Sequence, residues 1–227
     1  EEEEEEEEEE ESLSQPFCMA ASCQLRSYQL EGFGWLVRNY TQCVNCILAD
    51  EMGLGKTLQS IAFVAHLLRV LKHKGPVLFI VPLSVLFNWM QEFKKFCPSL
   101  NVLRLHSTDA EEQLRLRKRL NDPSTECVVT TYDAVKSGGL AHSLKRIAWR
   151  SVFLDEGHRV KNEASDMTRA CHALRARFRV ILTGTPVQNN LHEFGALLSF
   201  LAPNVFTDLS LFDAAFKLRI GRKGGGG

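Results

Sequence analysis

Short continuous apolar runs alternate along the chain with longer segments in which apolar residues recur every three or four positions. Continuous runs are typical of strands that are buried on both faces, and the longer spacing is typical of amphipathic helices. The predicted strands are 44–49, 77–81, 102–105, 127–131, 152–154 and 180–182. The predicted helices are 25–40, 58–71, 84–96, 111–120, 164–176, 191–201 and 209–218.

This alternation predicts an α/β fold in which a mostly parallel central sheet carries helices on both faces. Such sheets bind their ligands at the carboxyl ends of the strands. Five segments with candidate chemistry lie at the carboxyl end of a predicted strand, and we expect them to meet at one edge of the sheet. They are Asp50–Thr57, Pro82–Ser84, Thr130–Asp133, Asp155–His158 and Thr183–Pro186.

The two ends of the chain differ in composition from its middle. Glu1–Glu11 is a run of like charges that repels itself, so we predict that it is disordered. Residues 12–24 are small and polar, which predicts a linker, and 219–227 form a flexible glycine-rich end. The sequence therefore predicts one folded domain over residues 25–218. The acidic tail could screen a basic body, act as an interaction arm, or be a low-complexity end.

The formal net charge of −1 conceals a basic domain. Glu1–Glu11 supply 11 of the 28 acidic residues, so the rest of the chain carries 27 basic and 17 acidic side chains, a balance of +10. A basic body favours a polyanionic partner, although a well-solvated surface would give the same balance. The charged helix predicted at 111–120 is open to three interpretations: a solvated face, a contact with nucleic acid, or a localisation signal.

Cysteine usage and hydropathy exclude several classes of protein. Seven irregularly spaced cysteines argue against a disulfide framework, and the pair Cys43 and Cys46 has no second pair at zinc-finger spacing. Buried thiols are the favoured interpretation. No apolar stretch reaches the roughly 20 residues that span a bilayer, and a glutamate-rich start is the opposite of a signal peptide. We expect a soluble, reduced, intracellular protein without a membrane partner.

A glycine loop connects the first predicted strand to the next helix, with the sequence Asp50-Glu51-Met52-Gly53-Leu54-Gly55-Lys56-Thr57. Glycines let backbone N–H groups turn toward a phosphate, and the following helix N-terminus adds positive potential. In such a loop, Lys56 reaches the β- and γ-phosphates and the Thr57 hydroxyl binds Mg²⁺. Asp50 stands where the general pattern has its first glycine, so a chance match is the alternative.

Other residues complete a possible site for ATP and Mg²⁺. The amide of Gln29 can pair with the N6/N7 edge of adenine, or it is an ordinary surface residue. Asp155 leaves an apolar strand and is the expected partner of Mg²⁺, while Glu156 would orient the attacking water. The alternative is that the two acids belong to an ordinary polar loop. His158 could hydrogen-bond to Thr183–Thr185 and register the nucleotide state, or these threonines are turn and capping residues.

Six segments, in this order, resemble the first RecA-like lobe of a Swi/Snf-type ATPase of helicase superfamily two. They are LRSYQLEGFGWL, ILADEMGLGKTLQ, VPLSVLFNWMQEF, VVTTYD, LDEGHRVKNEAS and LTGTPVQNNLHE. Within that family the chain is most similar to the imitation-switch (ISWI) remodellers. The resemblance runs from Leu25 to about Phe212, which is most of the chain.

The resemblance implies an ATP-driven nuclear motor that tracks along duplex DNA, usually on nucleosomes, with histones as further possible partners. It implies adenine reading by Gln29, phosphate binding by Asp50–Thr57, Mg²⁺ and water roles for Asp155 and Glu156, and coupling by His158 and Thr183-Gly184-Thr185. It also implies that one DNA strand runs along two segments, since phosphate contacts position the protein without reading sequence. The residues implied are Pro82, Ser84, Asn88, Trp89, Thr130, Thr131 and Tyr132.

Two departures from the family pattern affect these expectations. Gly157 stands where many relatives have alanine, which changes little because glycine also occurs there. The 227 residues also include no second lobe, which in relatives supplies the arginines that stabilise the transferred phosphate. An arginine finger contributes roughly 10³–10⁵ in rate, so we expect weak ATP binding and hardly any hydrolysis by this lobe alone. The alternatives are a non-catalytic module that binds DNA, histones or a partner lobe, and a phosphate-loop ATPase unrelated to nucleic acid.

Overall fold

The central sheet has six strands in the order β1-β6-β5-β2-β4-β3, and every neighbouring pair is parallel. The computed structural model describes residues 14–51, 53–160, 165–184 and 191–206. The strands are β1 (Cys46–Leu48), β2 (Val77–Val81), β3 (Val102–Leu105), β4 (Cys127–Thr131), β5 (Ala148–Asp155) and β6 (Arg175–Leu182). The predicted parallel sheet is confirmed.

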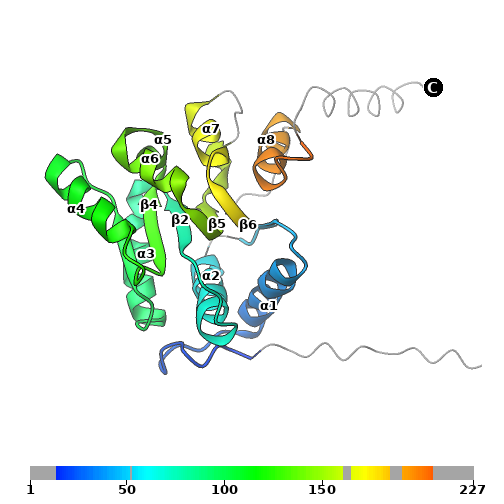
Figure 1. The fold of residues 1–227 in the computed structure, drawn as a ribbon. Coiled ribbons are helices and arrows are strands. Elements are labelled where there is room, and N and C mark those ends of the chain that lie inside the picture. Colours follow the sequence, from blue (N-terminus) through cyan, green and yellow to red (C-terminus); the bar gives the residue numbers. More distant parts are fainter. Residues whose placement is uncertain (1–13, 52, 161–164, 185–190, 207–227) are drawn as a thin grey trace, which may run out of the picture.

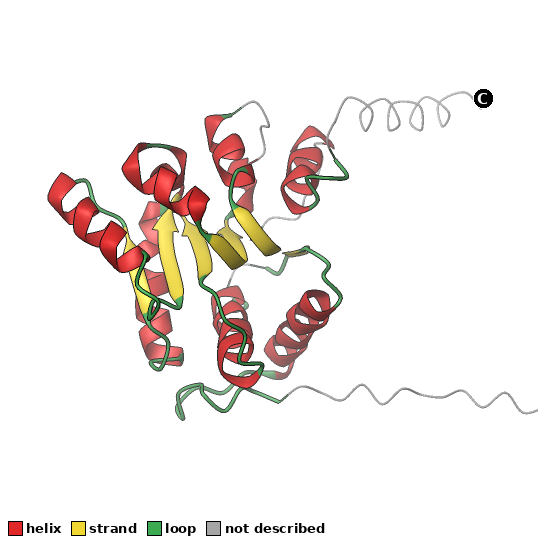
Figure 2. Cartoon of the chain, viewed as in Figure 1, coloured by secondary structure: helices red, strands yellow, loops and turns green. Residues whose placement is uncertain are grey.

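Helices cover both faces of this sheet, which makes the three-layer α/β arrangement expected from the sequence (Figures 1 and 2). One face carries α1 (Ser27–Thr41), α2 (Lys56–Ala65) and α3 (Leu83–Phe96). The other face carries α4 (Ala110–Leu120), α5 (Tyr132–Lys136), α6 (Gly138–Arg146), α7 (Asp166–His172) and α8 (Leu191–Leu201). None of the helices in the described part of the chain combines the length and the apolarity needed to cross a bilayer.

The pleat of the central strand β2 explains why there are two cores. Val77, Phe79 and Val81 pack with helices α1–α3, whereas Leu78 and Ile80 point to the opposite face. All five residues of β2 have no exposed surface, which is why the strand is a continuous apolar run in the sequence. Phe79 also stacks on Phe153 of β5, with ring centroids 4.6 Å apart. A fully buried phenylalanine contributes about 1.5–3 kcal/mol, so this stack firmly holds β5 against β2.

The sequence patterns did not predict the short helices α5 and α6, and they misplaced the boundary between α7 and β6. Sequence periodicity extends the helix to residue 176, but α7 ends at His172 and Arg175 already belongs to β6. The reason is pairing: Arg175 lies opposite Ala148 and Ala176 opposite Trp149 in the β5–β6 ladder. The predicted helix 58–71 is confirmed as α2 followed by the π-helical turn His66–Val70. The helix predicted at 209–218 lies outside the described residues.

The N-terminal segment before α1 is packed against the domain from residue 14 onward, which corrects the predicted linker. Met19 and Cys23 are buried, and the Ala20 amide donates to the Phe96 carbonyl at 2.8 Å. The Gln15 side chain spans this turn, donating to the Cys23 carbonyl and accepting from the Leu25 amide. Local sequence patterns do not predict this packing, because the segment contacts residues far along the chain, such as Phe96.

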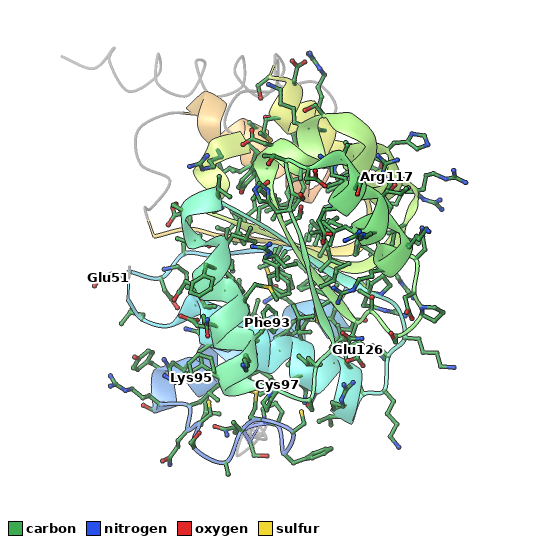
Figure 3. All side chains as sticks on the ribbon, turned by 90° about the vertical axis from the view of Figure 1, so that its left-hand side faces the viewer. Glu51, Phe93, Lys95, Cys97, Arg117 and Glu126 are labelled. Carbon is green, nitrogen blue, oxygen red and sulfur yellow. The ribbon has the colours of Figure 1, made fainter. Side chains whose placement is uncertain are left out.

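An ion pair between Arg69 and Glu126 lies at the amino ends of the strands, on the side of the domain away from the phosphate loop. Two hydrogen bonds of 2.5 and 2.7 Å join the two side chains, and Arg69 also donates to the Ser99 carbonyl. The Asn101 amide donates to the same carboxylate at 2.9 Å. Figure 3 places Glu126 on the opposite side of the domain from Glu51 of the loop. Burial raises the pKa of Glu126, but the bonds from Arg69 and Asn101 outweigh burial and lower it.

We expect Glu126→Gln to lower the free energy of unfolding at pH 7 by about 1–2 kcal/mol, because charge-assisted bonds are lost. The lowered pKa means that this carboxylate stabilises the fold above the ordinary glutamate value of about 4.3, and that the stability is lost as pH falls through the folded pKa. Urea unfolding from pH 3 to 7 should show the two proteins converging at acid pH. The control is Glu112→Gln, which breaks an exposed pair with Arg115 at 3.7 Å and should change little. If the difference in unfolding free energy between the unaltered protein and Glu126→Gln persisted at pH 3, this role of the Glu126 carboxylate would be wrong.

Candidate functional site

The carboxyl ends of three adjacent strands bring the predicted ATP-binding segments together. In the sheet register, Asp155 of β5 lies opposite Leu182 of β6, which lies opposite Leu48 of β1. The Thr183 amide donates to the Leu48 carbonyl at 3.1 Å, so the segment after β6 is joined to the segment after β1. The phosphate loop, the acidic pair and the start of the Thr183 segment therefore share one edge of the sheet, as expected for segments that follow parallel strands.

The phosphate loop forms a tight turn that leads into α2. Gly53 has φ +88° and Gly55 has φ +82°, values that L-residues with a side chain rarely adopt. The Lys56 ammonium donates back to the carbonyls of Asp50 at 2.6 Å and Glu51 at 2.9 Å. Lys56, the one cationic residue in the sequence of the loop, therefore lies over the turn, beside the N-terminus of α2. This arrangement suits a polyanion such as a phosphate chain.

Gln29 is not an exposed surface residue. It is 7% exposed, and its amide oxygen accepts from the Arg26 amide at 3.0 Å while its amide nitrogen donates to the Leu54 carbonyl at 3.2 Å. A glutamine amide has two donors and two acceptor lone pairs. These contacts use one of each, so one donor and one acceptor remain, which is what pairing with the adenine edge requires. The amide of Gln29 thus connects the predicted base site with the phosphate loop.

Asp155 is held in place by three contacts from different elements. Its carboxylate accepts from the Trp89 indole N–H at 2.8 Å and from the Glu156 amide at 3.0 Å, and its carbonyl accepts from the Tyr132 hydroxyl at 2.7 Å. Burial raises the pKa of Asp155 above its ordinary value, while the bond from Trp89 and the charge of Lys56 oppose that rise.

The turn after Asp155 is strained and tightly packed. Glu156 has φ +52°, an uncommon left-handed conformation for a residue with a long side chain, and such strain clusters at functional sites. A side-chain carbon at position 157 would lie 2.2 Å from Ile181, so β6 approaches too closely for alanine. This packing gives a physical reason for Gly157, the departure from the family pattern.

The residues expected along DNA divide into two groups. Ser84 and Asn88 are exposed on α3, where Asn88 donates to Glu92 at 3.0 Å. The others are buried: Pro82, Trp89, Thr130, Thr131 and Tyr132. We therefore correct the expectation for the buried side chains, whose polar groups have partners inside the domain, and only their backbone could face DNA. For example, the Thr130 hydroxyl donates to the Leu105 carbonyl.

The remaining predicted site residues are placed in part. His158 lies in the short helical turn Gly157–Val160, and Gly184 follows Thr183 at the end of β6. Thr57 lies half-buried in the first turn of α2. Met52 and Thr185 lie outside the described residues. Two positioning roles were not predicted from the sequence: Trp89 of α3 and Tyr132 of α5 both support Asp155.

The site fits a magnesium nucleotide by its donor chemistry. Among the described residues, no group of three or more His, Cys, Asp or Glu side chains is placed to hold a metal ion. Mg²⁺ commonly binds through one or two protein oxygens and takes its other ligands from substrate phosphates and water. The Asp155 carboxylate retains free lone pairs beside its two hydrogen bonds, and the Thr57 hydroxyl lies in the first turn of α2. These two oxygens are a suitable protein contribution.

We expect Gly55→Ala to abolish measurable nucleotide binding and to destabilise the fold. A side-chain carbon there would lie 2.4 Å from the Gln29 amide nitrogen, in addition to the cost of the positive φ. Gly53→Ala is the matched control, because its φ is also positive but nothing lies within 4 Å. The control should lose only about 1–2 kcal/mol, the cost of a left-handed residue. Calorimetric titration and thermal unfolding of both variants check this, and equal losses in the two would contradict the role of Gln29.

The chain matches the SNF2-related domain over residues 28–224. It is 43% identical over 196 residues to the ISWI chromatin-remodeling complex ATPase ISW2 of Saccharomyces cerevisiae, an alignment that covers 86% of this chain and 17% of the relative. It is 42% identical over 192 residues to the human SWI/SNF-related matrix-associated actin-dependent regulator of chromatin subfamily A member 1, covering 85% of this chain and 18% of the relative. The chain thus spans less than a fifth of the length of these curated relatives.

A solved structure shares the fold. The Sulfolobus solfataricus SWI2/SNF2 ATPase core in complex with dsDNA superimposes with a TM-score of 0.77 at 31% sequence identity, covering 89% of this chain and 40% of that chain. The same core solved as the domain alone gives a TM-score of 0.76 at 30% identity and covers 93% of this chain. The match supports the RecA-like assignment of the three-layer fold.

Proposed function

The chain belongs to the SNF2-related family, and we propose that it is the ATP- and DNA-binding lobe of an ATP-dependent DNA translocase that remodels chromatin. The observation that carries this proposal is the meeting of the phosphate loop, Asp155 and the Thr183 segment at one edge of the parallel sheet. Nucleotide chemistry needs a phosphate cradle, a magnesium ligand and a residue that orients water in one place. This edge offers candidates for all three.

In this proposal each residue has a defined task. Gly53–Thr57 hold the phosphates, and Lys56 leaves its own loop carbonyls to bind the β- and γ-phosphates. Thr57 and Asp155 would bind Mg²⁺, which when present offsets charge on the phosphates. Glu156 orients the attacking water. Gln29 reads the adenine edge with its remaining donor and acceptor.

Hydrolysis in this proposal needs a second lobe. Charge that spreads over the γ-phosphate must be compensated from the side of the nucleotide that faces away from the sheet edge, and an arginine in that position contributes roughly 10³–10⁵ in rate. The family resemblance assigns such arginines to the second lobe. We therefore expect this lobe alone to bind nucleotide weakly and to hydrolyse it very slowly. His158 and Thr183–Thr185 would couple the nucleotide state to movement between the lobes.

Duplex DNA is the proposed track, bound near the start of α3. Ser84 and Asn88 are exposed there, and their hydroxyl and amide groups suit phosphate contacts. The dsDNA complex of the Sulfolobus solfataricus relative and the basic balance of residues 12–227 support this assignment. The chromatin-remodelling relatives support nucleosomal DNA as the substrate, histones as neighbouring partners, and a location in the nucleus.

Equilibrium binding tests this function on the chain alone. Calorimetry should show that Mg·ADP binds at least about 10-fold more tightly than Mg·GDP, since one unmatched hydrogen-bonding edge costs at least that much. A labelled duplex should bind with similar affinity whatever its sequence, and the affinity should fall steeply with salt. Failure to bind either nucleotide at millimolar concentration would refute the proposed site. Nucleotide binding without DNA binding would favour an ATPase unrelated to nucleic acid.

A further inference from the structure

The side-chain amide of Gln59 is buried and has no role in the proposed function. Gln59 lies on α2, two residues after Thr57, and its side chain has no exposed surface. Its amide oxygen has no hydrogen-bond partner among the described residues. A buried polar atom without a partner destabilises a fold, so packing alone would favour an apolar residue at this position.

The nitrogen of the same amide faces the phosphate loop. The Gln59 nitrogen donates to the Asp50 carboxylate at 3.2 Å, and it lies 3.5 Å from the Leu54 carbonyl, a longer and weaker contact. Leu54 is also the residue held by Gln29. Two glutamines from different helices therefore converge on one carbonyl of the loop, and Gln59 alone also reaches the first residue of the loop.

The surroundings of Gln59 leave little freedom for its side chain. On the side of α1, a side-chain carbon at position 32 would lie 1.9 Å from the Gln59 amide oxygen, so only glycine leaves room for it. The contact with Asp50 also bears on the departure noted in the sequence. Asp50 replaces the first glycine of the general phosphate loop, and here its carboxylate is the acceptor for Gln59.

We propose that Gln59 is a positioning residue that holds the phosphate loop in its binding shape through Asp50 and Leu54. The amide ties the beginning of the loop to its middle, and α2 fixes the amide relative to Lys56 and Thr57 on the same helix. The loop then does not have to be ordered by the incoming phosphates, and this preorganisation raises affinity. The inference rests on the proposed function, because it concerns how the same site is kept ready for nucleotide.

Gln59→Met separates positioning from packing. Methionine has nearly the same length and volume but has neither the donor nor the orphan oxygen. We expect the affinity of the chain for Mg·ADP and for Mg·pyrophosphate, measured by calorimetry, to fall about 10-fold, as for loss of a residue that orients a ligand-binding group. The thermal unfolding midpoint should stay the same or rise. A purely structural role would instead lower the midpoint together with the affinity.

Two further variants keep the test specific. Asp50→Leu removes the acceptor for Gln59 and should lose as much affinity for Mg·pyrophosphate as Gln59→Met, and the two losses should not add. The matched control is Ser151→Ala, which removes another buried orphan oxygen, on β5, and should leave affinity unchanged.

Pyrophosphate also distinguishes the two glutamines. Gln59→Met should weaken Mg·pyrophosphate and Mg·ADP by the same factor, because Gln59 acts on the phosphate loop, whereas Gln29→Met should weaken Mg·ADP more. Unchanged affinity of Gln59→Met for both ligands would overturn this inference and leave the proposed function intact. Failure of the unaltered chain to bind either ligand would overturn both.

Discussion

Lys56→Ala is expected to abolish DNA-stimulated ATP turnover by this chain joined to a second lobe, while its affinity for duplex DNA stays within about twofold. In the structure the Lys56 ammonium donates to the carbonyls of Asp50 and Glu51 in its own loop. Removing a preorganised charge that faces the transferred phosphate costs about 10²–10³ in rate. Because these loop bonds are near the surface, the fold should lose no more than about 1 kcal/mol.

Turnover and DNA affinity of the Lys56→Ala protein are measured on the same preparation, with Lys74→Ala as the control. Lys74 is an exposed lysine on the opposite edge of the sheet, so its loss should affect neither quantity. If Lys56→Ala lost DNA binding and turnover together, Lys56 would be mainly a structural residue of the loop.

Asp155→Asn is expected to have the second-largest effect, a loss of turnover in the joined protein of more than the roughly 10–100-fold that follows loss of a supporting residue. The amide can still accept a hydrogen bond from Trp89, but it removes the negative charge that would bind Mg²⁺. Raising the Mg²⁺ concentration should restore part of the activity. Trp89→Phe is the companion variant, because it removes the bond that orients Asp155, together with part of a buried ring, and leaves the carboxylate in place; we expect its loss of turnover to be smaller.

The same substitution should show that burial of the Asp155 carboxylate lowers the free energy of unfolding as pH rises. Burial raises the pKa of Asp155, so the folded state holds this proton more tightly than the unfolded state does. The stability linked to this carboxyl is therefore present below the ordinary aspartate value of about 3.9 and is lost as pH rises through the folded pKa. Asparagine does not titrate, so the stability of the unaltered protein relative to Asp155→Asn should fall as pH rises.

Urea unfolding of both proteins between pH 4 and 8 measures this difference. The other carboxylates, including Glu126, are common to the two proteins and cancel. A difference that grew in favour of the unaltered protein with rising pH would mean that Asp155 is stabilised as a carboxylate, contrary to the burial of its environment.

Local patterns predicted the sheet and the phosphate loop correctly because their signals are carried by neighbouring residues. The continuous apolar run Val77–Val81 is the buried central strand, and the glycines at 53 and 55 adopt the positive φ values that make the turn. The order of strands and helices then required the parallel sheet and a common edge for its ligand-binding segments.

Contacts made over long sequence distances account for what the sequence did not predict. Ladder pairing with β5 extends β6 back to Arg175, although the local pattern there is helical. Residues 14–24, predicted as part of a linker, pack on the domain through Met19 and Cys23. Trp89 was expected on a DNA surface, yet this residue of α3 is 1% exposed and its indole N–H holds the Asp155 carboxylate. Propensity and spacing carry no information on such partners.

We propose that this lobe binds ATP at the carboxyl ends of its strands and uses it to act on duplex DNA. The most direct test measures ATP turnover with and without duplex DNA, for the chain alone and for the chain joined to a second lobe of a related remodeller. We expect hardly any ATP turnover by the chain alone, and ATP turnover that rises strongly with DNA in the joined protein. A joined protein that binds DNA but never hydrolyses ATP would support a non-catalytic binding module, and turnover that DNA does not change would contradict the motor.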